Sequence, residues 1–204
     1  MRDVTRADDA ADGPTDDGFD EEAWRRTLRE NRAEKDRFLA EHPQSPVPPG
    51  EREAFDGLDY HEPDPDYRVP ATVTVHDVPE PAALEASAGP PVRHLHVATF
   101  AFDLPTAADC ALRAYRQADE DDVDGDGGLF VPFADATTGA ETYADGRYLE
   151  LAPEREPTTG ETVTLDFNLA FTPFCAFNDA FACPLPPAEN RLDAPVRAGE
   201  RAPK

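Results

Sequence analysis

Hydrophobic and polar residues follow two different periods along this chain, and the period changes near Pro43. Between residues 20 and 41 apolar side chains such as Trp24 and Leu39 recur at intervals of three and four, which is the period of an amphipathic helix. Asp20 precedes two glutamates and can cap the first turn, where the helix dipole also favours acidic side chains. The pattern therefore predicts a helix over 20–41 that ends before Pro43.

The middle of this helix's inward stripe is polar, because Asn31, Arg32 and Lys35 fall on it. Apart from Lys204, Lys35 is the only lysine in a chain that uses arginine almost everywhere. A compact ammonium differs chemically from a guanidinium. One hypothesis is that Lys35 reaches an acidic group of the β-rich part, with Asp166 as its partner. The alternative is that Lys35 lies over apolar surface and extends its amine to solvent.

After residue 44 the apolar runs become short and alternating, and Pro, Gly and Asp separate them, which is typical of strands. Asp145-Gly146 predicts a type I′ hairpin turn, and residues 135–139 predict a second turn. One early helix and many short strands predict a mainly β (α+β) fold, an antiparallel barrel or sandwich with the N-terminal helix packed across it. The predicted strands are 67–76, 92–104, 110–117, 129–133, 142–144, 147–151 and 162–171.

Composition divides the chain into three stretches. Residues 1–18 are rich in Asp, Ala and Gly with almost no large apolar side chains, which predicts a disordered acidic tail. Residues 19–43 hold the helix and residues 44–201 hold the β-rich part. Their combined length is that of a single domain, so we expect the helix and the strands to share one core.

The chain is strongly acidic, with a formal net charge of -24 from 43 acidic and 19 basic residues. Its hydrophobic content is 39%, below the usual ~45–50%. Acidity carried with arginine rather than lysine is typical of cytosolic proteins that work in multimolar salt, where charges are screened beyond ~3 Å and mainly keep the surface hydrated. The alternative is an acidic surface made to bind a cationic partner.

Several classes of partner are not expected. The chain has no basic patch to neutralise phosphates, so nucleic acid is not a predicted partner. It has no run of ~20 apolar residues to span a membrane, and residues 1–18 lack the apolar core of a secretory signal. A cytoplasmic location follows as the prediction, and the oligomeric state is not determined.

Asp166 and Asn168 fall on the same face of the predicted strand 162–171, since strand side chains alternate. If that face lines a barrel interior, the two side chains form a polar floor for a pocket. If it faces solvent, they are ordinary surface residues. Both interpretations are open.

Cys175 and Cys183 lie in a proline-rich segment that must be held rigidly. They could form a disulfide, although cytosolic disulfides are uncommon, ligate a metal, or remain small buried thiols. A zinc site completed by His94 and His96 would have irregular spacing, and neither cysteine has a visible catalytic partner. We therefore predict no metal and no cofactor here.

Residues 122–127 match the first half of a calcium-binding loop. The twelfth position of such a loop should be a bidentate glutamate, but it is Phe133 in this chain. The run also lies between predicted strands rather than between helices. An acidic hairpin loop is the better interpretation.

Five ordered motifs occur in the second half of the chain. They are 133–139, 141–149, 165–168, Cys175 to Phe177 with 183–192, and 198–200. Looser matches before them include Trp24, Arg32, Lys35, Asp36, Phe38 and Tyr60. Together these residues resemble an uncharacterised domain-of-unknown-function family, number 1684, with members in bacteria and halophilic archaea, densely over residues 130–201 and more loosely before them. The resemblance implies that these positions form a shared site or a shared structural unit, and it implies no established activity.

Three functions fit these residues. The first is a small-molecule-binding β-domain, with Arg147 as an anchor for an anion. The second is a hydrolase or isomerase in which Asp166 acts as general acid or base, although no catalytic residue is assigned. The third is a structural protein without a ligand, in which Asp166, Asn168 and Asn190 are bonded to the main chain. The predicted ligand-binding residues are Lys35, Tyr143, Arg147, Asp166, Asn168, Cys175 and Asn190.

Overall fold

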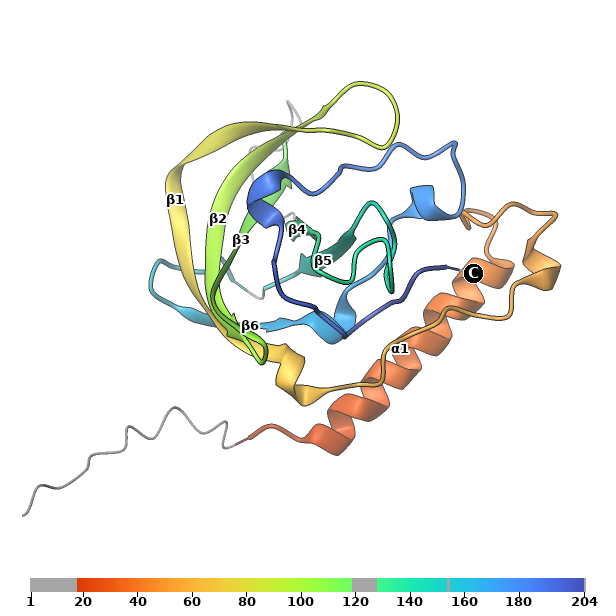
Figure 1. The fold of residues 1–204 in the computed structure, drawn as a ribbon, viewed down its shortest axis with the longest axis horizontal. Helices are drawn as coiled ribbons and strands as arrows, with labels where there is room; N and C mark the ends of the chain where they lie inside the picture. The colour runs from red at the N-terminus through yellow and green to blue at the C-terminus, as the bar shows by residue number, and fades with distance from the viewer. Residues whose placement is uncertain (1–17, 119–127, 154, 204) are drawn as a thin grey trace, which may run out of the picture.

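The computed structural model describes residues 18–118, 128–153 and 155–203 (Figure 1). The predicted acidic tail and the calcium-like run at 122–127 therefore lie outside the described residues, apart from Gly18. In the described part of the chain no helix is long and apolar enough to span a bilayer.

The predicted N-terminal helix is confirmed as α1 (Glu21–Glu41). Asp20 is its N-cap and accepts a hydrogen bond from the main-chain nitrogen of Ala23 at 2.9 Å. Leu28 and Leu39 of its apolar stripe are buried. The helix lies outside the curled sheet, and the C-terminal end of the described chain runs beside it (Figure 1).

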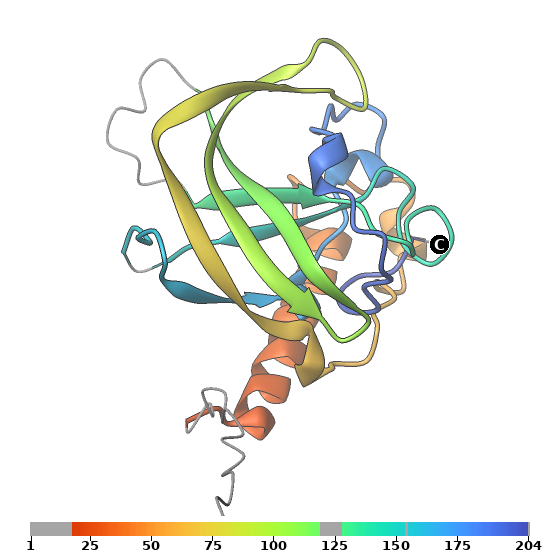
Figure 2. The ribbon, with the colours of Figure 1, turned by 60° about the vertical axis from the view of Figure 1, so that its left-hand side comes forward.

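The strands form one six-stranded sheet with the order β5-β4-β3-β2-β1-β6. Every ladder in it is antiparallel. The sheet curls into a half-barrel (Figures 1 and 2), so the mainly β fold with one N-terminal helix is confirmed. The strands are β1 (Arg68–Leu84), β2 (Val92–Leu104), β3 (Ala107–Gln117), β4 (Leu129–Phe133), β5 (Arg147–Leu151) and β6 (Thr162–Asp166).

Register shifts in the two long ladders accompany the curl. The β1–β2 ladder shifts between Val75 and Glu80, and the β2–β3 ladder shifts between His96 and Ala98. Such bulges bend a strand and increase its twist. The concave face buries the main apolar core, which includes Phe100, Leu112, Val131, Phe133, Leu165 and Phe167.

The two edge strands, β5 and β6, do not pair with each other. Among the described residues, β5 is bridged to the segment that follows β6 at Tyr148 and Phe171, which exchange two main-chain hydrogen bonds of 2.9 Å. Past this bridge the edges stay apart. A gap between β5 and β6, which we call the seam, is therefore built into the topology.

Two local predictions were wrong. Residues 142–144 are not a strand, because Thr142 hydrogen-bonds locally within the turn at 137–142 and forms only an isolated bridge with Thr138. Asp145-Gly146 is not a type I′ turn, which needs positive φ at both residues. Gly146 has φ +88°, but Asp109 is the only non-glycine residue with positive φ among those described.

The predicted strand 162–171 is also shorter than expected. It ends at Asp166, whose side chain accepts a hydrogen bond from the nitrogen of Asn168 and caps the 3-10 turn η3 (Phe167–Leu169). The alternation of faces is lost in this turn, so Phe167 is buried while Leu169 is 48% exposed. The other 3-10 turns are η1 (Arg52–Ala54), η2 (Pro65–Tyr67), η4 (Phe174–Ala176) and η5 (Ala188–Asn190).

Candidate functional site

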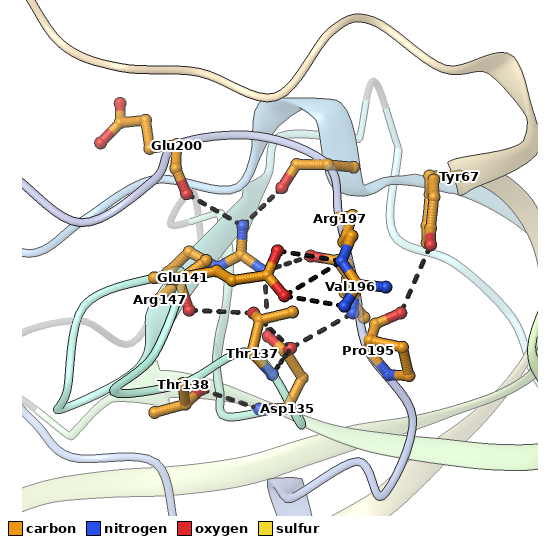
Figure 3. Close-up of polar contacts among 12 residues, drawn as sticks. Tyr67, Asp135, Thr137, Thr138, Glu141, Arg147, Pro195, Val196, Arg197 and Glu200 are labelled. Atoms are coloured by element: carbon orange, nitrogen blue, oxygen red, sulfur yellow. Dashed lines mark hydrogen bonds and ion pairs between the residues drawn. The ribbon is translucent and has the colours of Figure 1, made fainter.

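Arg147, the first residue of β5, lies in a fully buried polar cluster (Figure 3). Its side chain is 0% exposed. Nη2 donates to Asp135 Oδ2 at 2.9 Å and to the carbonyl of Val196 at 2.8 Å. Nη1 donates to the carbonyls of Ala198 and Glu200. The guanidinium therefore fastens the C-terminal segment to the loop that follows β4.

Asp135 completes this cluster from the turn at 135–139. Its Oδ1 accepts from the nitrogen of Thr137 at 2.7 Å, from the Thr137 hydroxyl at 2.6 Å and from the nitrogen of Val196 at 3.2 Å. Burial lowers the pKa of Arg147, and the charge of Asp135 opposes that shift. A ligand could reach Arg147 only by opening the cluster, so this geometry favours a structural role over the predicted anion anchor.

Asn190 is used in the same structural way. Its Oδ1 accepts from the nitrogen of Arg113 at 2.8 Å, and its Nδ2 donates to the carbonyls of Arg113 and Pro132 at 2.9 and 2.7 Å. The buried amide thus extends the main-chain ladder of β3 and β4 to the turn η5. Both amide protons and one lone pair of Oδ1 are therefore occupied.

Asn168 repeats this arrangement between β6 and the segment before β1. Its amide exchanges hydrogen bonds with the main chain of Asp64, at 2.9 Å to the nitrogen and 2.8 Å to the carbonyl. Asp166 contacts Asn168 through Oδ1 and accepts from Trp24 Nε1 through Oδ2 at 2.7 Å. Arg68 Nε lies 3.3 Å from the same Oδ2. Asp166 therefore holds α1 to the end of β6.

Tyr143, Cys175 and Cys183 belong to a second apolar cluster, in which Phe130 and Tyr148 also pack. Both cysteines are unbonded thiols, and the nitrogen of Cys175 donates to Cys183 Sγ at 3.3 Å. The described residues contain no group of three or more His, Cys, Asp or Glu side chains arranged to hold a metal ion. The seven predicted ligand-binding residues are thus spread over several places and do not form one pocket.

The Cys183 thiol should react slowly with alkylating agents in the folded protein. Burial raises its pKa to about 11 from 9.0, so the thiolate fraction at neutral pH falls about 100-fold. Iodoacetamide labelling followed by peptide mass spectrometry checks this, with the urea-unfolded protein as the control. Equal labelling rates in the folded and unfolded protein would contradict it.

A cavity of about 150 Å³ lies between α1 and the segment that follows β6. We call it the α1 pocket. Its polar members come from four separate parts of the chain: α1, the segment before β1, the turn η3 and the C-terminal segment. The lining residues are Leu28, Asn31, Arg32, Lys35, Tyr60, Asn168, Leu169, Ala170, Phe171 and Glu200.

Arg32 and Tyr60 bring unpaired donors to this pocket. Arg32 Nη1 donates to the carbonyl of His61 at 3.0 Å, but its Nε and Nη2 are buried without a partner. The guanidinium lies 4.4 Å above the ring of Tyr60, whose buried hydroxyl also has no partner. Burial lowers the pKa of Arg32, yet a guanidinium stays charged in proteins. Burial, together with the charge of Glu200, raises the pKa of Tyr60, so its phenol keeps its proton.

Lys35 does pair with an acidic residue, but the predicted partner Asp166 was wrong. Its Nζ donates to Glu200 Oε1 at 2.5 Å, and Glu200 Oε2 accepts from the nitrogen of Thr172 at 2.8 Å. Asp166 instead contacts Trp24, which is three helical turns from Lys35, or about 16 Å along the axis. The carboxylate of Glu200 points away from Arg147 (Figure 3), so this residue joins the buried cluster to the α1 pocket.

Sequence reasoning did not select Arg32, Tyr60 or Glu200 as ligand-binding residues. All three lie among the residues that carry the family resemblance, which is the signal that could have identified them. Arg32 was noted only as the neighbour of Lys35 on the polar part of the helix stripe.

A second, larger cavity of about 330 Å³ occupies the seam. Its walls are mostly apolar and come from β5, β6 and the barrel core. Leu169 lines this cavity as well as the α1 pocket. The remaining lining residues are Phe100, Leu129, Leu149, Glu150, Leu151, Ala152, Pro153, Pro157, Val163, Thr164, Leu165 and Asp166.

Residues 53–201 match the family described as "Protein of unknown function (DUF1684)". The chain belongs to this family. The match covers Tyr60, Asn168 and Glu200 of the α1 pocket, whereas Arg32 and Lys35 precede it. The family assignment made from the sequence motifs is confirmed.

The fold of this DUF1684 member is also similar to a solved structure from a halophilic archaeon. That structure is the solution NMR structure of the uncharacterised protein from gene locus rrnAC0354 of Haloarcula marismortui. The two chains are 56% identical with a TM-score of 0.69, and the match covers 88% of this chain and 95% of the other. The chain matches no curated protein.

A pair of histidines on β1 and β2 should make the stability of this DUF1684 member depend on pH. The rings of His76 and His96 lie 4.3 Å apart, and Nε2 of each contacts Thr99 Oγ1. Burial lowers the pKa of His96, and the charges of His76 and Arg113 add to this, while Glu80 opposes it. Below about pH 6.5 His96 takes up a proton in the unfolded chain, whereas folding disfavours that protonation. The free energy of unfolding therefore decreases as the pH falls.

Urea unfolding between about pH 8 and pH 5 measures this loss. We expect a shallower decline in His96→Gln than in the wild type. His42→Gln, at an exposed position just after α1, is the matched control and should keep the wild-type slope. An unchanged slope in His96→Gln would show that His96 does not cause the pH dependence.

Proposed function

We propose that this protein binds a small organic anion in the α1 pocket. The observation that carries the proposal is the set of buried, unpaired donors at this cavity: Arg32 Nε, Arg32 Nη2 and the Tyr60 hydroxyl. A buried donor without a partner costs about 1–3 kcal/mol, and more when it is charged. An anion that accepts from these atoms removes that cost, and the flat fork of a guanidinium matches a carboxylate in two places.

The charge of the pocket supports an anionic ligand. Arg32 and Lys35 are cationic, and Glu200 is the one carboxylate that lines the cavity with them. The lining therefore carries one net positive charge in a chain whose formal net charge is -24. At the molar salt that the composition favours, surface charges act only over ~3 Å, so the acidic exterior would not keep an anion out.

The hydrolase or isomerase alternative has less support. The carboxylate of Asp166 already accepts from Trp24 and Asn168 and lies beside Arg68. These contacts occupy both carboxylate oxygens and leave little freedom for proton transfer to a substrate. The structural hypothesis describes Asn168 and Asn190 well, but it does not account for the unpaired donors of the α1 pocket.

Isothermal titration with a panel of small carboxylates and their neutral amides tests the proposal. We expect the carboxylates to give a heat of binding and the neutral amides to give none. Arg32→Gln should weaken binding by about 10- to 100-fold, since a hydrogen bond to a charged group contributes about 1.5–3 kcal/mol. Arg37→Gln, at an exposed position of the same helix, is the control and should bind as the wild type does. Equal affinity in both variants would contradict the proposal.

A further inference from the structure

We infer that the ligand is a monocarboxylate with an apolar tail, whose head lies in the α1 pocket and whose tail enters the seam between β5 and β6. For its head group this inference rests on the proposed function. The position of the tail in the seam has a separate basis, which is the contact between the two cavities.

The two cavities share one wall. Leu169, at the end of the turn η3, lines both of them. It is 48% exposed and, with Val78, is one of two exposed large hydrophobic residues among those described. In the same turn, Asp166 lines the seam and Asn168 lines the α1 pocket, and Asn168 Nδ2 donates to Asp166 Oδ1 at 2.9 Å. A chain that leaves the α1 pocket along Leu169 therefore reaches the seam directly.

The lining of the seam is suited to an apolar group of a ligand. The seam remains open because β5 and β6 are unpaired sheet edges, and in the described part of the chain the bridge between Tyr148 and Phe171 joins β5 to the segment after β6 rather than to β6 itself. Pro153 and Pro157 also line the seam and offer no N–H donors. Its volume of about 330 Å³ falls in the range of small-ligand sites. The apolar wall consists of Phe100, Leu129, Leu149, Leu151, Val163 and Leu165.

The charges limit the head to a single negative charge. Arg32 and Lys35 against Glu200 leave one positive charge in the α1 pocket. Asp166 and Glu150 line the seam and would repel a second anionic group on the tail. A phosphate dianion would face Glu200 with its extra charge uncompensated. A monocarboxylate satisfies both the charge and the fork geometry of Arg32.

A series of straight-chain carboxylates, from acetate upward and below their aggregation limits, tests the tail by isothermal titration. Each added methylene that enters the seam should tighten binding about fourfold, until the cavity is filled. Val163→Phe fills the seam, and Leu169→Ser removes the shared apolar wall at a half-exposed position where folding is not at risk. Val163→Phe should bind acetate as the wild type does and lose the gain with chain length, and Leu169→Ser should lose that gain as well. Val78→Phe, at an 81% exposed position of β1, is the control and should keep both the wild-type affinity for acetate and the gain with chain length.

The outcomes separate the two claims. If short acids bind and longer ones bind no tighter, the tail is overturned while the proposed function stands. A gain with chain length that survives in both Val163→Phe and Leu169→Ser would place the tail elsewhere and overturn the inference. Tighter binding of an alkyl phosphate than of the carboxylate of equal length would overturn the monocarboxylate head. Absence of binding by every acid would overturn the proposed function, and the inference with it.

Discussion

Replacing Arg147 by methionine should lower the free energy of unfolding by about 3–5 kcal/mol, the usual cost of breaking a buried ion pair from one side. Methionine keeps most of the side-chain volume but cannot donate. The substitution leaves Asp135 as an unpaired buried charge and frees the carbonyls of Val196, Ala198 and Glu200. Denaturant unfolding followed by circular dichroism measures the loss.

The matched control is Arg197→Met, which breaks an ion pair next to the same cluster. Arg197 pairs with Glu141 at 2.7 Å, but the two side chains are 55% and 32% exposed. Both residues lie near the Arg147 cluster in Figure 3. An exposed pair contributes about 0–1 kcal/mol, so this variant should stay close to the wild type. Similar losses in the two variants would show that the buried cluster does not hold the C-terminal segment.

Gly199→Ala should be the second most damaging change, with an expected loss of about 2–5 kcal/mol from backbone strain and overpacking together. Gly199 has φ +75°, a left-handed conformation that favours glycine. An added Cβ would lie 2.5 Å from the carbonyl oxygen of Ala170 and 2.8 Å from that of Phe167. Neither backbone atom can move freely, because Ala170 packs in the core and its carbonyl accepts from Glu200.

Gly160→Ala is the control that separates the strain of a positive φ from the clash of the added Cβ with neighbouring backbone atoms. Gly160 also has positive φ, +88°, but a Cβ there would meet no atom within 4 Å. It should therefore cost only the left-handed strain of about 1–2 kcal/mol. Because Glu200 follows Gly199 directly, Gly199→Ala should also weaken anion binding, whereas Gly160→Ala should not. Thermal unfolding together with carboxylate titration checks both parts.

The sequence predicts the ends of a strand correctly where the alternation of apolar and polar residues stops at the same place as Pro, Gly or Asp residues begin. Residues 92–104, 129–133 and 147–151 were predicted with the bounds that the structure has. The predicted strand 67–76 is longer than expected, since β1 runs on to Leu84 through two prolines, Pro79 and Pro81. Beyond the bulge it pairs only with β2, so a proline there removes no hydrogen bond from a second neighbour.

The candidate site was harder to predict, because the same side-chain types serve structure and binding. Arg147 and Asn190 have the chemistry of ligand-binding residues, and only their burial and main-chain partners show how they are used. Lys35 was identified as an inward cation, but its partner depends on how α1 lies along the half-barrel, which no local pattern encodes. Glu200 lies 165 residues away from it in sequence.

The unpaired donors of the α1 pocket were beyond sequence reasoning for a similar reason. Tyr60 comes from an irregular segment with no periodicity, and its position over Arg32 follows from packing alone. The seam likewise depends on which strands are the sheet edges. A resemblance to a family marks such residues as shared, but it does not place them together.

The Nε–H resonance of Arg32 gives the most direct test of the central claim. In arginine-labelled protein this resonance is assigned by its loss in Arg32→Lys, and it is followed while hexanoate and then hexanamide are added. We predict a saturable shift of the Arg32 signal with hexanoate and none with hexanamide, because only the carboxylate can pair with the buried guanidinium. Saturation with hexanoate that leaves the Arg32 signal unmoved would contradict the assignment of the α1 pocket.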